Sequence, residues 1–233
     1  MKATGAKIYA IGVGKPCTRG SNQNKCYKPE ELEQIASSAE NIFEIDSYDK
    51  LIANRYSLLF SHQFYYSYTF SFGDDCNDTK EAPKPVTTVP PIAPPVVTVP
   101  MPNCPDAAID LLFVIDGSGS IGEKRFKLMK SWISEVANEF NINDDLTRVA
   151  LIHYSRKSLI EFGFQRGQTN AEITAAIASI DYNGGKTFTG NALLEAEGLL
   201  QFEMNNSEKS DQSVDQAYNV WLFADPTRVA VKD

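Results

Sequence analysis

A run of apolar residues that ends in an aspartate and a glycine- and serine-rich turn sets the fold class of this chain. Residues 110–115 read Asp-Leu-Leu-Phe-Val-Ile, and a near-continuous apolar run is typical of a strand buried on both faces of a parallel sheet. Asp116 follows, and then the turn 117–122. Apolar residues at helical spacing predict an amphipathic helix over residues 125–140. A strand, a turn and a helix in this order predict an α/β fold.

The residues after this helix continue the alternation. Further strands are expected at residues 148–154, 159–164 and 219–224, and further helices at residues 171–180 and 191–202. Such alternation indicates a Rossmann-like, mainly parallel sheet flanked by helices. In these sheets the binding crevice lies at the carboxyl ends of the strands, where Asp116 and Asp225 fall.

Clustered prolines divide the chain into three pieces. Nine of its 12 prolines lie between Pro83 and Pro105. The pieces are residues 1–57, residues 58–105 with an aromatic segment and the proline-rich linker, and residues 106–233. The first piece carries eight basic and seven acidic side chains, a net charge of +1, and the second carries two basic and four acidic side chains, a net charge of −2. The third carries twelve basic and nineteen acidic side chains, a net charge of −7, so the total is −8. The acidic third piece suits a cation or a basic partner better than a polyanion.

The first piece also has an α/β pattern. Residues 7–13 form an apolar run that is too short, and too rich in glycine, for a signal peptide, so we expect a buried strand there. Any secretion signal is therefore expected upstream. Pro29 is expected to begin a helix with Ala39 on its apolar face, before a strand at residues 42–45 and a closing helix at residues 47–60.

Composition and motifs argue against several classes of function. No apolar run approaches the roughly 20 residues of a membrane-spanning helix, and the acidic balance disfavours nucleic-acid binding. Residues 117–122 fit G-x-G-x-x-G, but Asp116 would repel a pyrophosphate there. A phosphatase that used Asp116 as its nucleophile would need a second acidic residue at position 118, which is a serine here. His153 lies inside an expected strand, so we expect it to be a core residue rather than a catalytic base. We therefore expect no enzyme activity.

The same turn suits a metal ion. Asp116, Ser118 and Ser120 stand at alternate positions of a tight turn, so that their oxygens can converge on one point. One carboxylate and two hydroxyls form a hard oxygen set, which favours Mg²⁺ or Mn²⁺ over zinc.

At three places the chain closely resembles the von Willebrand factor A (vWA) domain family. Residues 110–122 (DLLFVIDGSGSIG) resemble the start of the domain, where the metal-ion-dependent adhesion site has the motif D-x-S-x-S. Residues 184–193 (GGKTFTGNAL) resemble the segment that supplies a threonine ligand, which matches Thr187. Residues 219–225 (NVWLFAD) resemble the strand that supplies the last aspartate, which matches Asp225.

The resemblance implies a set of roles. Ser118, Ser120 and Thr187 would contact Mg²⁺ or Mn²⁺ through their hydroxyls, while Asp116 and Asp225 would hold it, often through water. An open coordination position would accept an acidic side chain of a partner, with collagen-like proteins as family expectations. The family usually has Thr-Asp-Gly at the last position, whereas this chain has Ala-Asp-Pro. The alternative is therefore a structural spacer repeat with a metal-free site.

Residues 2–57 resemble the last strands and helices of the same family. The chain thus looks like two incomplete vWA copies from a tandem array, as in matrilins and collagen VI. The first piece could dock in cis beside the strand at residues 219–224 and cover its edge.

Cysteines and sequons favour an oxidising, secreted setting. The four cysteines form no C-x-x-C pair, so a zinc site is not expected. Cys17 and Cys26 flank one loop and could close it. The resemblance suggests that Cys76 and Cys104 bridge domain ends, either each with a cysteine outside this chain or, in the docked form, with each other. Asn77 and Asn205 begin N-glycosylation sequons. The sequence thus predicts a secreted glycoprotein of the extracellular matrix, with no membrane insertion.

Overall fold

The computed structural model describes residues 5–14, 16, 29–53, 109–207 and 217–224. They form one six-stranded sheet with the strand order β2-β1-β6-β3-β4-β5. The strands are β1 (Lys7–Val13), β2 (Ile42–Ile45), β3 (Ile109–Asp116), β4 (Thr147–Tyr154), β5 (Ser158–Phe162) and β6 (Ala217–Ala224). All neighbours pair in parallel except β4 and β5. The predicted mainly parallel α/β fold is confirmed.

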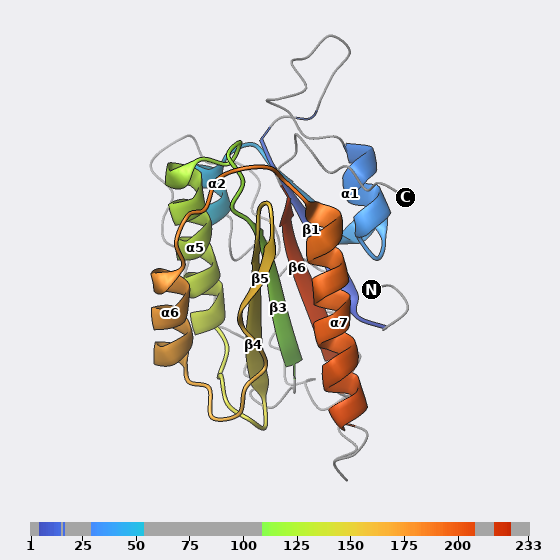
Figure 1. The fold of residues 1–233 in the computed structure, drawn as a ribbon, viewed down its shortest axis with the longest axis vertical. Helices are drawn as coiled ribbons and strands as arrows, with labels where there is room; N and C mark the ends of the chain where they lie inside the picture. Colours follow the sequence, from blue (N-terminus) through green and yellow to red (C-terminus); the bar gives the residue numbers. More distant parts are fainter. Residues whose placement is uncertain (1–4, 15, 17–28, 54–108, 208–216, 225–233) are drawn as a thin grey trace, which may run out of the picture.

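Helices cover both faces of this sheet (Figure 1). They are α1 (Pro29–Ile35), the 3₁₀ helix η2 (Ala39–Asn41), α2 (Tyr48–Ala53), α5 (Glu123–Asn138), α6 (Asn170–Ser179) and α7 (Thr189–Ser207). Helices α2, α5 and α6 lie on one face, and α1 and α7 lie on the other. Among the described residues, no helix has the length and apolar character needed to cross a membrane.

The strand periodicity of two divides the core into two layers. One set of strand residues packs with α2, α5 and α6; it includes Tyr9, Ile11, Leu111, Phe113, Val149, Leu151, Trp221 and Phe223. The alternate set faces α7 and α1; it includes Ile8, Ala10, Leu112, Val114, Ala150, Ile152, Val220 and Leu222. Strands buried on both faces account for the continuous apolar runs in the sequence.

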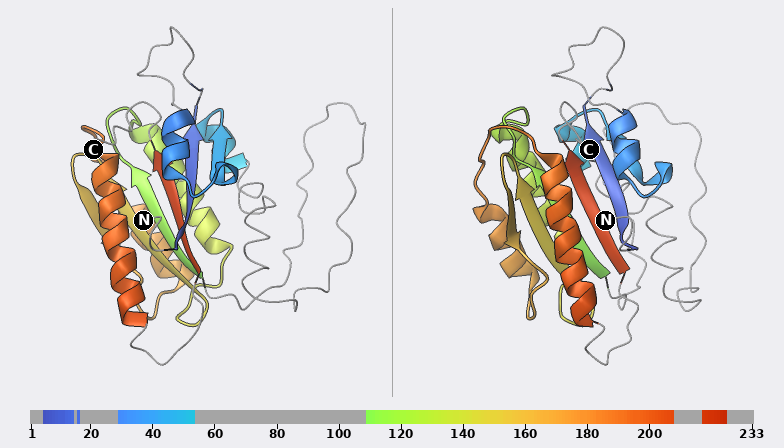
Figure 2. Two further views of the ribbon diagram at one scale, coloured as in Figure 1. Left: turned by 90° about the vertical axis from the view of Figure 1, so that its right-hand side faces the viewer. Right: turned by 45° about the vertical axis from the view of Figure 1, so that its right-hand side comes forward.

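The first piece supplies β2 and β1, which form one side of this sheet next to β6. Strand β1 pairs with β6 from Lys7↔Asn219 to Gly12↔Ala224, and Figure 2 shows the two strands side by side. This is the edge at which the docking hypothesis places residues 1–57, and the pairing agrees with that hypothesis. The origin of the pieces in two copies of one domain stays a prediction.

Helix boundaries differ from the sequence expectations in two informative places. Helix α1 begins at Pro29 as predicted but ends at Ile35. The reason is Ser37, whose backbone N–H donates to the Ile8 carbonyl (3.0 Å) and whose Oγ accepts from the Ile8 N–H (2.9 Å). Ala39, expected on the helix face, therefore begins η2. Helix α2 begins at Tyr48, and the rest of the helix predicted to residue 60 lies outside the described residues.

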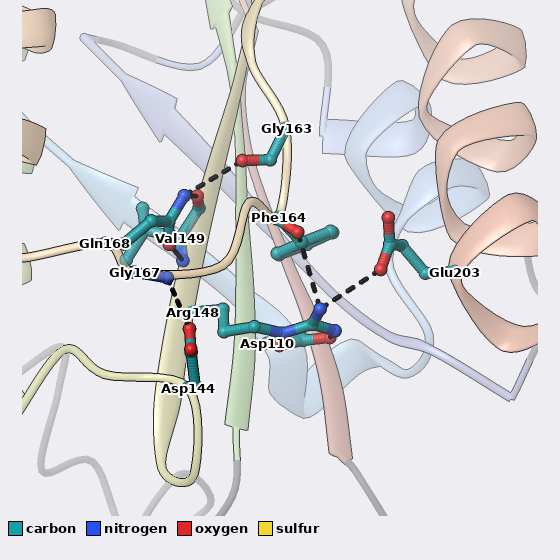
Figure 3. Close-up of polar contacts among 9 residues, drawn as sticks. All are labelled: Asp110, Asp144, Arg148, Val149, Gly163, Phe164, Gly167, Gln168 and Glu203. Atoms are coloured by element: carbon teal, nitrogen blue, oxygen red, sulfur yellow. Dashed lines mark hydrogen bonds and ion pairs between the residues drawn. The ribbon is translucent and has the colours of Figure 1, made fainter. Parts of the chain in front are cut away.

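A polar network stabilises the amino-terminal end of β3 and β4 (Figure 3). Arg148 donates from Nε to Asp110 (2.9 Å) on the neighbouring strand and from Nη1 to Glu203 (3.2 Å) on α7. Burial would lower the pKa of Arg148, but the hydrogen bond and charge of Asp110, with the charge of Glu203, raise it. Beside this network Gln168 bonds both backbone groups of Val149 (2.8 and 2.7 Å). This end of the sheet lies opposite to Asp116.

Candidate metal site at the carboxyl end of the sheet

Asp116 and Ser118 lie in the turn that leaves β3. Gly117 extends the ladder between β3 and β4 by one bond, because its N–H donates to the Tyr154 carbonyl (2.8 Å). Asp116 and Ser118 are fully buried, and the Ser118 N–H donates to Asp116 Oδ1 (2.7 Å). A buried carboxylate requires hydrogen bonds or a cation close by. The predicted ligands Asp116 and Ser118 are therefore held in one compact turn.

The third residue of the motif brings a second hydroxyl to the same place. Ser120 is exposed, and its Oγ lies 3.1 Å from the Ser118 Oγ in a hydrogen bond. Two neighbouring ligands of an octahedral Mg²⁺ ion, at 2.0–2.1 Å from it, are about 2.9 Å apart. The spacing of the two hydroxyls and the all-oxygen donor set thus fit one hard divalent cation.

A second loop, residues 181–188, is bonded to this turn. The Gly119 N–H donates to the Gly185 carbonyl (2.9 Å), and the Tyr182 hydroxyl donates to the Ser118 carbonyl (3.0 Å). Thr187, the predicted third hydroxyl ligand, lies two residues after Gly185 and is half-buried. The structure therefore brings the loop that carries Thr187 against the turn that carries the serines.

The end of β4 connects this loop to the last strand. The Phe188 N–H donates to the Ser155 carbonyl (3.1 Å). The hydroxyl of the buried Tyr154 accepts from Thr189 Oγ1 (3.3 Å) and donates to the Phe223 carbonyl (3.5 Å) near the end of β6. The carboxyl ends of β3, β4 and β6 thus meet at one place. Asp225, the fifth predicted site residue, lies outside the described residues.

His153 packs behind the turn. Its ring is buried beside Gly117 and Phe126, with ring centroids of His153 and Phe126 4.9 Å apart. Nδ1 lies 3.2 Å from Glu161 Oε1, whereas Nε2 has no hydrogen-bond partner within the described part of the chain. Burial lowers the pKa of His153, although Glu161 opposes this shift. The residue has the core position that the sequence predicts, but one of its two ring nitrogens is unsatisfied.

The donor chemistry of this place differs from that of a zinc site built on His or Cys. No group of three or more His, Cys, Asp or Glu side chains gathers anywhere in residues 5–14, 29–53, 109–207 and 217–224. The four cysteines lie outside the described residues, as does Asn77, while Asn205 is exposed near the end of α7. The described candidate site is therefore hydroxyl-rich, with one buried carboxylate.

Sequence reasoning missed the residues that hold the two loops together. Tyr182, Tyr154 and Gly185 make the connecting hydrogen bonds. Gly185 lies in the segment 184–193 that the sequence analysis singled out, but that segment does not reveal the bond from Gly119 to the Gly185 carbonyl. Tyr154 had a usable signal, because it ends a predicted strand next to the strand that ends at Asp116. The other two contacts join residues more than 60 positions apart.

Comparison with known proteins finds a family model and several similar proteins. Residues 110–217 match the model of the von Willebrand factor type A domain. The Xenopus laevis collagen alpha-1(XXI) chain is 34% identical over 104 residues, which cover 45% of this chain and 10% of that protein. Mouse vitrin is 37% identical over 101 residues, which cover 43% and 16% of the two proteins. The chain thus spans less than a fifth of the length of these relatives.

One solved structure is similar over most of the chain. It is proximal thread matrix protein 1 from the mussel byssus, solved with zinc in its metal-ion-dependent adhesion site (MIDAS) motif. It aligns with a TM-score of 0.43 and 19% identity over 95% of this chain and 44% of its own. The family match, the collagen and vitrin relatives and the parallel sheet with its serine turn agree: residues 110–217 of this chain are similar to the von Willebrand factor type A domain.

Proposed function

We propose that this chain is an extracellular adhesion or matrix protein that binds acidic side chains of partner proteins through a divalent cation. One observation carries the proposal. The hydroxyls of Ser118 and Ser120 lie 3.1 Å apart, beside a buried Asp116, at the carboxyl end of a parallel sheet. This donor set suits Mg²⁺ or Mn²⁺.

Five residues would hold the ion. Ser118, Ser120 and Thr187 would offer hydroxyl oxygens, and Asp116 and Asp225 would offer carboxylates. When bound, the cation supplies a positive charge with an open position for a carboxylate. The chain itself orients the donors: Asp116 fixes the backbone of Ser118, and Tyr182 anchors the same residue from the opposite loop.

Basic side chains around the turn support an acidic partner. Arg156, Lys157 and Lys186 are exposed on the two loops that follow β4 and precede α7. Arg156 lies against Gly185: its Nε atom is 3.0 Å from the position that a Cβ atom would take on this glycine. This local positive charge contrasts with the net charge of −8. It would steer a carboxylate toward the turn and weaken with added salt.

The proposed setting is extracellular. Two kinds of relative are collagen chains by name, types XX and XXI, and collagens are matrix proteins. The exposed Asn205 is open to glycosylation in a secretory pathway. We propose a secreted glycoprotein with disulfides, no enzymatic activity and a matrix or cell-surface protein as its partner.

Thermal unfolding with and without Mg²⁺ tests the metal site. For a ligand that binds only the folded state, Mg²⁺ at 100 times its Kd raises the free energy of unfolding by about 2.7 kcal/mol. We expect Mg²⁺ to raise the Tm of the wild type, EDTA to reverse the rise, and Asp116→Asn to abolish it. The control is Asp145→Asn, an exposed aspartate between α5 and β4.

A lack of any Mg²⁺ or Mn²⁺ effect on the wild type would overturn the metal site and favour the metal-free spacer repeat. Partner binding needs a separate assay. Immobilised collagen should retain the wild type with Mg²⁺ and release it with EDTA. Metal binding without any retention on collagen or other matrix proteins would count against adhesion and leave the metal site standing.

A further inference from the structure

The described part of the segment of residues 5–53 (5–14, 16 and 29–53) makes an interface of the kind found inside a domain. Every residue of β1 from Ile8 to Val13 is buried, although the segment is separated from β3 by 55 residues of chain (54–108). Its partner in the sheet is β6, which comes last among the strands. The contacts between β1 and β6 therefore join parts of the chain that no short connection holds together.

Aromatic packing forms the centre of this interface. The ring of Tyr9 stacks on that of Trp221 with centroids 4.8 Å apart, and Phe43 stacks on Trp221 at 6.1 Å with an interplanar angle of 3°. Tyr9 and Trp221 are almost completely buried. Without the segment, Trp221 and the edge of β6 would be open to another strand.

The segment also packs on a helix of the other piece. Leu51 of α2 is fully buried in the core shared with α5, and Arg125 of α5 lies 6.0 Å from the ring of Tyr48. The same arginine donates to the Ser120 carbonyl (3.3 Å) in the serine turn. The segment thus completes one core layer and contacts the helix that follows the candidate metal site.

Chain connectivity leaves the source of this segment open. A stretch of 55 residues reaches at most about 180–200 Å when extended, and it closes a loop at an entropic penalty that grows slowly with length. The contacts on β6 and α5 are the same whether residues 5–53 come from the same chain or from a second one. Only the loop closure favours the same chain, and it acts as an effective concentration on the order of 1 mM.

We propose that β6 and α5 also accept residues 5–53 of a second copy of this chain, so that two copies associate by exchanging this segment. Strands β1 and β2, which would be exchanged, lie together at one side of the sheet (Figure 2). Exchange needs no new surface, because every contact already exists within one copy. For a matrix protein it would provide a means of self-association without the cation.

A refolding experiment with the full chain tests this proposal in the presence of EDTA. Wild-type protein is refolded from urea at about 10 μM and at about 2 mM, concentrations on either side of the effective concentration within one chain. Sedimentation after dilution should show monomers from the first sample and long-lived dimers from the second. Monomers from both samples would overturn the proposal.

Complementation shows which segment is exchanged. One variant carries Tyr9→Asp and Ile11→Asp, which disable β1, and the other carries Phe113→Asp, which disables the receiving sheet. Refolded together, they should give a one-to-one dimer with one intact core and the native fluorescence of the buried Trp132 and Trp221. If the mixture recovers no native fluorescence while the wild type refolds under the same conditions, the proposal fails.

A matched control addresses ordinary association through exposed apolar residues. Leu194 and Phe202 on α7 are 68% and 62% exposed and belong to none of the core clusters that contain β1. The variant Leu194→Ser with Phe202→Ser should form the exchanged dimer as the wild type does. Loss of the dimer in this variant would assign it to α7 and contradict exchange.

Discussion

The Nε2 atom of His153 lies 1.9 Å from the position that a Cβ atom would take on Gly117. Gly117 is the residue between Asp116 and Ser118 of the candidate metal site, and His153 belongs to the neighbouring strand β4. No side chain fits at position 117 unless the histidine moves. The absence of a Cβ atom there is therefore part of how the serine turn lies on the sheet.

Substitution of Gly117 by alanine should destabilise the protein. Overpacking of a filled core commonly reduces the free energy of unfolding by about 1–3 kcal/mol, and urea unfolding would measure the change. The variants Gly117→Ala, His153→Ala and their combination form a double-mutant cycle. We expect the double variant to be more stable than the sum of the single effects, because the smaller residue 153 makes room. Strict additivity would contradict the steric explanation.

Stability should fall at acidic pH because of His153. Burial lowers the pKa of His153 in the folded protein, so the unfolded chain takes up the proton first. The neutral ring contributes its full stability above the unfolded pKa of about 6.5. That contribution is lost as the pH falls through this value toward the folded pKa, with a slope of at most about 1.4 kcal/mol per pH unit.

Urea unfolding between about pH 7.5 and about pH 5.5, about one unit to either side of the ordinary histidine pKa, would measure this loss. In His153→Gln this part of the pH dependence should disappear. The control is His62→Gln, since His62 is the only other histidine of the sequence. An unchanged pH slope in His153→Gln would contradict the prediction.

Removal of the Asp110 carboxylate should be strongly destabilising. Asp110 is fully buried, and its loss leaves the largely buried Arg148 with only Glu203 as its charged partner in the described network. Breaking a buried ion pair costs about 3–5 kcal/mol, and solvent contact of Arg148 places Asp110→Ala near the lower value. The control is Glu123→Gln, which breaks an exposed pair with Lys127 and should leave the Tm nearly unchanged. Equal Tm values for the two variants would contradict this account.

Tyr182 should tune the proposed metal site without touching the ion. Tyr182→Phe keeps the ring beside Phe126 (5.6 Å between centroids) but removes the hydrogen bond to the Ser118 carbonyl. Loss of an outer contact of this kind reduces metal affinity by about 10-fold or more. Calorimetric titration with Mg²⁺ would measure the change. The control is Tyr218→Phe, because Tyr218 lies near the start of β6, at the end of this strand that is remote from the candidate site. Equal affinities in both variants would show that this bond does not position Ser118.

Local pattern predicted much of this fold. The apolar runs that became β1, β3 and β6 were recognisable because each strand is buried on both faces. The helix predicted at residues 125–140 is α5 (Glu123–Asn138), although Trp132 was not foreseen on its buried side. Positions in strands and helices follow a short repeat, so the chain alone reveals them.

Partners distant in sequence could not be read in this way. Tyr182 bonds to Ser118, His153 packs on Gly117, and Arg148 joins Glu203 only because the strands assemble in the order β2-β1-β6-β3-β4-β5. Each of these pairings depends on the register between neighbouring strands and on the loop path above them, neither of which leaves a local signal.

The oxygen donors Asp116, Ser118 and Ser120 follow from sequence alone, since alternate positions of one tight turn bring them together whatever the rest of the chain does. Assembly of the sheet adds the loop that carries Thr187, because Gly119 bonds to Gly185 across two packed segments. It also places β1 against β6, where stacking of Tyr9 on Trp221 and burial of both faces reward a contact between the first and last strands. Short-range geometry thus brings the proposed ligands together, and long-range burial determines what surrounds them.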